Sequence, residues 1–168
     1  MSLEVIKQKV ENSLKKLRRN DWFLIHADTN ERTISHKLAE YLQEEFPYPN
    51  WNVDCEYNRH FMDIKKVAVP AKPDVGWDDI EAKTVYPDII VHRRNSDDAN
   101  LLVIEVKKSS NQSGHQFDIH KLAAFTKDEY RYRFGLFLIL SMNGTFDILV
   151  WHSNGEKIDE EQIPLETN

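Results

Sequence analysis

The chain has 168 residues, of which 40% are hydrophobic and 30% charged, and its formal net charge is -6. This balance supports one core and therefore one main domain, and only 5 Gly and 6 Pro exclude collagen-like and long disordered chains. A single cysteine, Cys55, excludes an internal disulfide and a multi-cysteine zinc site. Since no run approaches 18 apolar residues and no apolar signal core follows the first residues, we expect a reduced, cytoplasmic protein without a membrane partner.

The first part of the chain predicts two amphipathic helices, a strand and a long polar segment. Residues 3–19 carry apolar side chains at helical spacing, and the capping sequence Asp28-Thr29-Asn30-Glu31 starts a second helix that ends before Pro47. In residues 53–57, apolar and polar side chains alternate, which predicts a strand. Residues 58–84 are mostly polar, and we expect a flap or a small irregular insertion, because long connections often lie at binding sites.

The second part predicts four strands and one helix. The expected strands are residues 85–92, 101–107, 134–140 and 146–151, and the expected helix, residues 117–130, separates the second strand from the third. Asn143-Gly144 is a tight-turn sequence for the last hairpin. This order predicts an α/β domain in which helices flank a mixed central sheet.

Two of the predicted strands carry ionisable residues where a buried strand should be apolar. Residues 101–104 are all apolar, which indicates burial on both faces, and they lead to Glu105 and Lys107, which alternation puts on one side. Asp88 follows Pro87 at the start of the preceding strand. If the two strands pair, Asp88 and Glu105 converge, and hard carboxylate oxygens suit Mg²⁺. Lys107 would then stabilise charge on a phosphate or position a nucleophile.

The sequence Pro87-Asp88, followed by Glu105-Val106-Lys107, resembles the signature of the PD-(D/E)XK superfamily of restriction-endonuclease-like nucleases. The resemblance implies an αβββαβ core and a metal-dependent nuclease that hydrolyses phosphodiester bonds of DNA, with RNA left open. Asp88 and Glu105 would bind Mg²⁺, with Mn²⁺ as a substitute, and Lys107 would assist hydrolysis. The resemblance covers the chain after the first helix. Residues 1–20 are therefore interpreted as an N-terminal helix and residues 21–168 as the nuclease-like domain.

Two other acidic residues are candidates for the same site. Glu31 opens the helix face that should meet the sheet, where the superfamily often carries an acidic residue, but it also suits a first helical turn as a favourable charge. Glu56, at the end of the first strand, either faces the site or pairs with Arg59.

Three residues near the signature are candidate nucleic-acid contacts. Lys108 must point to the opposite side of the strand from Lys107. There it either has a structural role or contacts the phosphate backbone of a nucleic acid. Ser109 lies just past the strand end, where loops commonly touch substrate. Lys121 lies on the following helix, where superfamily members often present a polar residue to phosphate, although a solvated helix lysine is the alternative.

Two other interpretations remain open. The chain can be a nuclease-fold module that binds nucleic acid or a partner without catalysis, which the acidic net charge favours, or the signature can be a structural ion pair between Lys107 and a carboxylate. The superfamily often works as dimers, and the apolar stripe of the first helix is a candidate dimer contact. Recognition of substrate would come from residues 58–84, including Trp77, from the first helix, or from a partner subunit.

Overall fold

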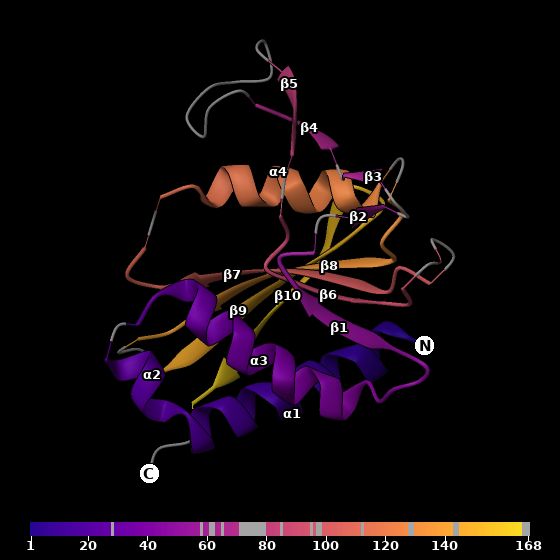
Figure 1. The fold of residues 1–168 in the computed structure, drawn as a ribbon. Coiled ribbons are helices and arrows are strands. Elements are labelled where there is room, and N and C mark those ends of the chain that lie inside the picture. Colours follow the sequence, from indigo (N-terminus) through magenta and orange to yellow (C-terminus); the bar gives the residue numbers. More distant parts are fainter. Residues whose placement is uncertain are drawn as a thin grey trace.

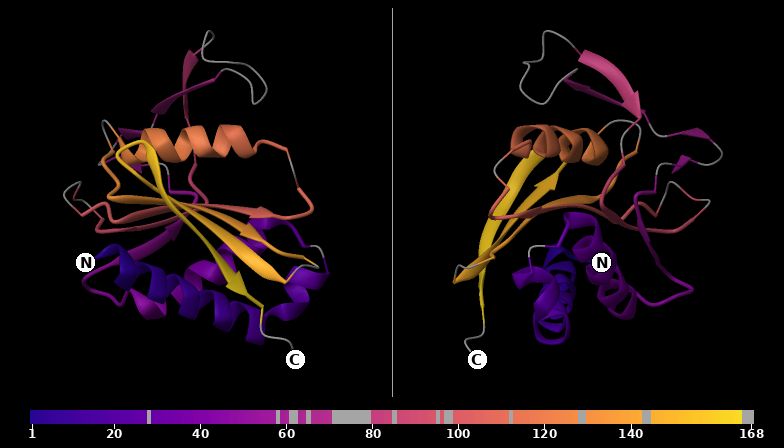
Figure 2. Two further views of the ribbon diagram at one scale, coloured as in Figure 1. Left: turned by 180° about the vertical axis from the view of Figure 1, so that it is seen from behind. Right: turned by 60° about the vertical axis from the view of Figure 1, so that its left-hand side comes forward.

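A six-stranded mixed sheet separates three helices on one face from a single helix on the other (Figure 1 and Figure 2). This computed structural model describes the chain apart from residues 28, 58, 61–62, 65, 71–79, 85, 95, 97–98, 112, 128–129, 143–144 and 166–168, and it describes residues 59–60, 63–64, 66–70 and 80–84 by their backbone alone. The mixed α/β architecture expected from the sequence is confirmed.

The sheet has the strand order β1-β6-β7-β8-β9-β10. Only β7 and β8 pair in parallel, and the crossover between them contains α4, as a parallel connection requires. The strands are β1 Asn52–Cys55, β6 Ile89–His92, β7 Leu102–Lys108, β8 Phe134–Leu140, β9 Phe146–Ser153 and β10 Glu156–Pro164.

Two apolar cores hold the layers together. On one face, α1 (Leu3–Asn20), α2 (Trp22–His26) and α3 (Glu31–Glu45) cover a core built around side chains such as Leu38 and Leu136. On the other face, α4 (His115–Thr126) covers a smaller core that includes Phe125 and Phe137. Among the helices of the described chain, none has the length and apolar character needed to cross a bilayer.

For residues 58–84 we expected a flap or a small irregular insertion; the described residues of this segment form two small antiparallel strand pairs, and residues 58, 61–62, 65 and 71–79 lie outside the described residues. Its strands are β2 Arg59–His60, β3 Asp63–Ile64, β4 Lys66–Pro70 and β5 Ile80–Thr84. The β4/β5 hairpin stands beyond α4, away from the main sheet, and β4 contacts that helix (Figure 1). Trp77 and the Asn143-Gly144 turn lie outside the described residues.

The first helix packs into the main core of its own chain. Ile6, Val10 and Leu17 are fully buried and Leu14 is 1% exposed, because the helix lies against α3 and the sheet. The prediction that this apolar stripe forms a dimer contact is therefore wrong, since its side chains are already buried within the same chain.

Leu14→Ala is expected to lower the free energy of unfolding by about 3 kcal/mol, because it leaves a cavity between α1 and the rest of the core. Urea unfolding measures the loss, with Val5→Ala as the control, since Val5 lies on the same helix and is 46% exposed. The control is expected to change stability by less than about 0.5 kcal/mol. Equal effects of the two substitutions would contradict the packing of α1.

The edge pair β1/β6 is held by an ionic contact on Asp54. Its carboxylate binds His92 Nε2 at 2.8 Å and Arg94 Nε at 2.9 Å. Burial acts to raise the pKa of Asp54, but these two partners outweigh it and lower the pKa to about 2. A carboxyl with a depressed folded pKa stabilises the protein above its unfolded pKa and loses that contribution as the pH falls toward the folded pKa.

The stability difference between the wild type and Asp54→Asn is therefore expected to be constant above about pH 5 and to shrink between about pH 4 and pH 2. Thermal unfolding of both proteins across this range measures the difference. A gap that stays constant down to about pH 2 would show that the carboxylate is not held by its partners.

Candidate functional site

The predicted hairpin of two buried strands is present and brings Asp88 beside Glu105. β6 and β7 pair antiparallel with Ile89 opposite Ile104, so the next positions, Asp88 and Glu105, also face each other. Asp88 Oδ2 accepts a hydrogen bond of 2.7 Å from the backbone N–H of Val106. The strand begins at Ile89 instead of residue 85, which leaves Asp88 at its mouth.

Strand alternation divides the charged residues of β7 between the two faces. Glu105 and Lys107 point toward α4, and Lys108 points to the face of α3, as predicted. Lys108 Nζ donates to the backbone oxygen of Thr29 at 3.0 Å, which joins the end of β7 to the segment before α3.

α4 supplies two partners for these residues, Asp118 and Lys121, which are three residues apart and so share a helix face. Lys121 Nζ lies 2.7 Å from Glu105 Oε2 and 2.9 Å from Asp118 Oδ1. Lys107 Nζ lies 3.1 Å from Asp118 Oδ2, within ion-pair distance but without hydrogen-bond geometry. Lys121 is 8% exposed, so it is not the solvated helix lysine that we considered as an alternative.

The start of α3 completes the group with Glu31. Its Oε1 accepts from the backbone N–H of Lys108 at 3.1 Å and from Asn111 Nδ2 at 3.0 Å, and its Oε2 lies 3.6 Å from Lys107 Nζ. Glu31 therefore does more than place a favourable charge in the first helical turn, because it fixes the end of β7 and faces Lys107.

Six side chains thus form what we call the charged cluster: Glu31, Asp88, Glu105, Lys107, Asp118 and Lys121. Four carboxyl groups against two amino groups give it a formal charge of -2. Glu105 is 2% exposed and Asp118 5%, whereas the side chain of Lys107 is 18% exposed and that of Glu31 24%. The cluster is therefore buried at Glu105 and opens toward solvent at Lys107 and Glu31.

Burial shapes the titration of the two signature carboxyls. Desolvation raises the pKa of Glu105 well above its ordinary value, and the charge of Asp88 adds to that, while Lys121 opposes it. Desolvation also raises the pKa of Asp88, against the hydrogen bond from Val106 and the charge of Lys121. A further positive charge placed between the two carboxyls would therefore stabilise the ionised form of both.

The two lysines keep their protons. Burial acts to lower the pKa of Lys107, but Asp118 and Glu31 outweigh it and the net shift is upward. Burial likewise acts to lower the pKa of Lys121, and Glu105 and Asp118 raise it by more. Lys107 is therefore a cation that can stabilise developing negative charge, and it is unsuited to act as a general base near neutral pH.

The donor set around Glu105 fits a hard divalent cation. Glu105 Oε1 is a buried acceptor for which the described residues provide no hydrogen-bond partner, which is costly unless something binds it. No group of three or more His, Cys, Asp or Glu side chains in the described part of the chain could hold a metal ion. Mg²⁺ needs no such group, since it is commonly held by one or two carboxylates, waters and substrate phosphate oxygens.

Three of the predicted site residues lie outside the charged cluster: Lys108, described above, Glu56 and Ser109. Glu56 is exposed and pairs with Arg32, with 2.7 Å between its Oε1 and Arg32 Nε; the side chain of Arg59, the partner that we considered, is not described. Ser109 Oγ accepts from the backbone N–H of Met142 at 3.1 Å, and the residue lines a hollow of about 430 Å³ with Ser110 and Phe146. Ser109 is next in the chain to Lys108, whose backbone N–H donates to Glu31 of the cluster.

Asp118 is the cluster member that the sequence analysis missed. A signal for it was present, because an Asp three residues before a Lys follows the signature strand on the next helix. No protein-family model, curated protein or solved structure matches this chain.

Proposed function

We propose that the chain is a metal-dependent nuclease that hydrolyses phosphodiester bonds of DNA. The observation that carries the proposal is the charged cluster, which has a formal charge of -2 and contains a buried carboxylate oxygen without a hydrogen-bond partner among the described residues. Its open side presents the Lys107 ammonium group. A cluster of this charge is complemented by one divalent cation, and its open side suits an anionic substrate.

Asp88 and Glu105 would hold the Mg²⁺ ion. When bound, the ion would supply positive charge to polarise the phosphate and to offset charge that develops during hydrolysis. Lys121 keeps a positive charge beside Glu105 and so favours the ionised carboxylate that a metal ligand must be.

The remaining residues of the cluster would serve the substrate. Lys107 would bind a phosphate oxygen, because it is protonated and partly exposed. Asp118 would orient Lys107 from α4, and Glu31 would do so from α3, so that the ammonium group stays at the open side.

The order of the elements supports a restriction-endonuclease-like core. α3, β1, β6, β7, α4 and β8 follow the αβββαβ order that the resemblance implies, with β2–β5 as an insertion after the first strand. Asp88 immediately precedes the second strand of that order, and Glu105 and Lys107 lie in the third.

The proposal is tested by incubating the protein with plasmid, linear duplex and single-stranded DNA, and with RNA, in Mg²⁺, Mn²⁺ or EDTA. We expect cleavage of DNA with either metal and none with EDTA. Cleavage that continues in EDTA, or that Glu105→Ala and Lys107→Ala leave unchanged, would refute the assignment.

A second candidate is a module of the same fold that binds nucleic acid or a partner without catalysis. The distance of 2.7 Å between Lys121 Nζ and Glu105 Oε2 favours it, because this ion pair partly satisfies Glu105 without a metal. Calorimetric titration with Mn²⁺ separates the two candidates. Absence of binding by the folded protein would support the second.

A further inference from the structure

An apolar hollow lies beside Lys107 on the same face of the sheet. Lys107 on β7 pairs with Ile139 on β8, and Ile139 pairs with Ile148 on β9. Paired positions of neighbouring strands point to one face, and strands lie about 4.8 Å apart, so the three side chains form a row on the face of α4. Ile139 and Ile148 line the hollow of about 430 Å³ that also includes Ser109, which we call the β8/β9 hollow. It therefore begins one strand away from Lys107.

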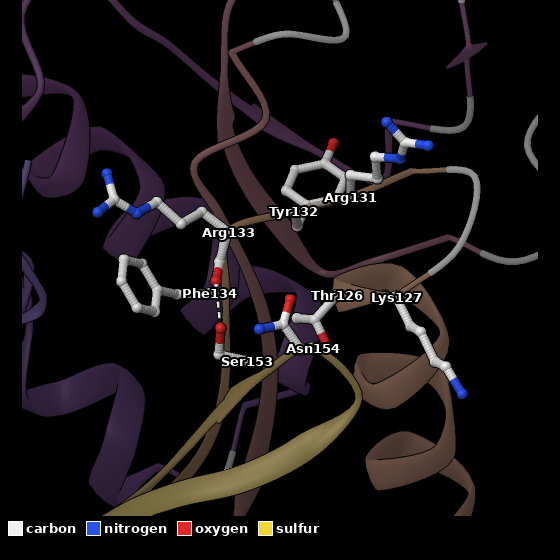
Figure 3. A pocket seen from close by; sticks show the side chains of 8 residues that line it. All are labelled: Thr126, Lys127, Arg131, Tyr132, Arg133, Phe134, Ser153 and Asn154. Carbon is white, nitrogen blue, oxygen red and sulfur yellow. Dashed lines mark hydrogen bonds between the residues drawn. The ribbon is translucent and has the colours of Figure 1, made fainter.

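A larger hollow lies at the other end of β8, away from Lys107. It has a volume of about 640 Å³ and is formed where α4 ends and β8 begins, and Figure 3 shows Arg133 and Phe134 among its lining side chains. Phe134 precedes Ile139 by five residues of β8, which corresponds to about 17 Å along the strand. Of these two hollows, the β8/β9 hollow is therefore the one that lies beside the charged cluster.

Apolar side chains and hydroxyl groups line the β8/β9 hollow. Its described lining consists of Ser109, Ser110, Ile139, Ser141, Met142, Thr145, Phe146 and Ile148. Phe146 is 37% exposed and supplies an aromatic ring. A lining of this kind suits an uncharged, flat group with polar edges, which is the character of a nucleobase.

The chain segments that line the β8/β9 hollow carry little charge. Residues 109–110 and 139–148 contain one charged side chain, Asp147. Asp147 is 1% exposed and pairs with Arg18 of α1, which packs on the opposite face of the sheet. Asn143-Gly144 lies outside the described residues, but neither residue has a charged side chain. A neutral surface thus lies next to the Lys107 cation, which matches a nucleotide, since a nucleotide joins an uncharged base to a charged phosphate.

We propose that the β8/β9 hollow binds an unpaired base of the nucleic acid whose phosphate Lys107 contacts, and that Phe146 stacks on this base. The inference rests on the proposed function, because that function assigns the phosphate to Lys107. In a duplex the neighbouring bases cover both faces of a base and its partner covers its edge, so a base reaches the hollow from a single strand, from a frayed end or after flipping. The inference therefore predicts a preference for single-stranded DNA.

The test compares two labelled oligomers of equal charge: a short oligothymidylate and its abasic counterpart, which keeps the sugar-phosphate backbone without the bases. Fluorescence anisotropy measures their binding in Ca²⁺ and again in EDTA, so that the result does not depend on cleavage. Phe146→Ala removes the ring from the hollow. Phe23→Ala is the matched control, because Phe23 is 71% exposed on α2, across the sheet from the hollow.

Phe146→Ala is expected to weaken binding of the oligothymidylate about tenfold and to leave binding of the abasic oligomer within about twofold of the wild type. Phe23→Ala is expected to leave both affinities unchanged. Equal effects of Phe146→Ala on the two oligomers, equal effects of the two substitutions, or absence of binding by the wild type would overturn the inference.

Two further variants keep the test decisive if thermal unfolding shows that Phe146→Ala is damaged. Phe146→Tyr keeps the ring and is expected to keep the wild-type affinity for the oligothymidylate, whereas Phe146→Leu keeps an apolar side chain without a ring and is expected to lose affinity. Equal affinities of these two variants would overturn the inference.

Two other outcomes are excluded in the same series. On blunt duplex DNA, Phe146→Ala is expected to change the affinity by less than about twofold, because the bases there are paired; a tenfold loss on the duplex would show that the ring does not bind an unpaired base. A dimer in analytical ultracentrifugation that Phe146→Ala dissociates would place a second copy of the chain in the hollow and would also overturn the inference.

The two proposals fail separately. Metal-dependent cleavage without an effect of Phe146→Ala overturns only the base-binding hollow. Binding that depends on the ring, without metal-dependent cleavage, overturns only the nuclease.

Discussion

Glu105→Gln is expected to lower the cleavage rate in Mg²⁺ by about a thousandfold or more, which corresponds to the loss of several kcal/mol of transition-state stabilisation. The amide keeps the size of the side chain and can still accept from Lys121, but it removes the negative charge that a divalent cation needs. Single-turnover cleavage with protein in excess measures the chemical step. Glu56→Gln is the matched control, because Glu56 is exposed and lies outside the charged cluster, and its rate is expected to stay within about twofold of the wild type.

Lys107→Met tests whether the Lys107 ammonium group stabilises the substrate phosphate during cleavage. We expect a loss of about a hundredfold or more in rate, since the variant lacks the ammonium group at the open side of the cluster. If Lys107 is only a structural partner of Asp118, the rate would hardly change and only the free energy of unfolding would fall. Measuring both quantities on the same variant separates these outcomes.

Lys121→Met is expected to have the largest effect on stability, about 3 to 5 kcal/mol near neutral pH. The substitution leaves Glu105, a carboxyl that is 2% exposed, without its ion-pair partner. Guanidinium unfolding measures the loss. The double variant Glu105→Gln with Lys121→Met removes both charges and is expected to recover most of it. A double variant no more stable than Lys121→Met would show that the ion pair is not the cause.

The loss caused by Lys121→Met is expected to shrink as the pH falls from neutral toward the unfolded pKa of a glutamate side chain, about 4.3. Burial already raises the pKa of Glu105 well above its ordinary value, and removal of Lys121 acts in the same direction. A carboxyl whose folded pKa exceeds its unfolded pKa of about 4.3 stabilises the protein in its protonated form and destabilises it as the pH rises through the folded pKa. A loss that does not depend on pH would contradict a buried, uncompensated Glu105.

Local pattern was enough to predict the elements that position the charged cluster. The apolar run before Glu105 marked a strand buried on both faces, and alternation then placed Glu105 and Lys107 on one side. The pairing of this strand with the one after Asp88 was a condition of the predicted site, and the structure shows that the two strands pair. Glu31 was a candidate because the superfamily often carries an acidic residue on this helix and because Glu31 lies on the apolar stripe of α3; its contact with the end of β7 is consistent with that.

Other parts of the fold depend on contacts between distant segments, which local pattern does not show. β10 was not predicted, because an edge strand rich in charged residues lacks apolar alternation. Its acidic residues meet α1, where Lys7 pairs with Asp159 and Glu161. The five-residue helix α2 is too short to show a helical period. Asp118 was missed because its partner Lys107 comes from another element.

The most direct test of the metal site is a crystal structure after soaking in Mn²⁺, examined by anomalous scattering. We expect one strong peak between the carboxylates of Asp88 and Glu105, at metal–oxygen distances of about 2.0 to 2.3 Å. A fully occupied Lys121–Glu105 ion pair with no peak beside Asp88, at Mn²⁺ concentrations that saturate cleavage or binding, would contradict this expectation.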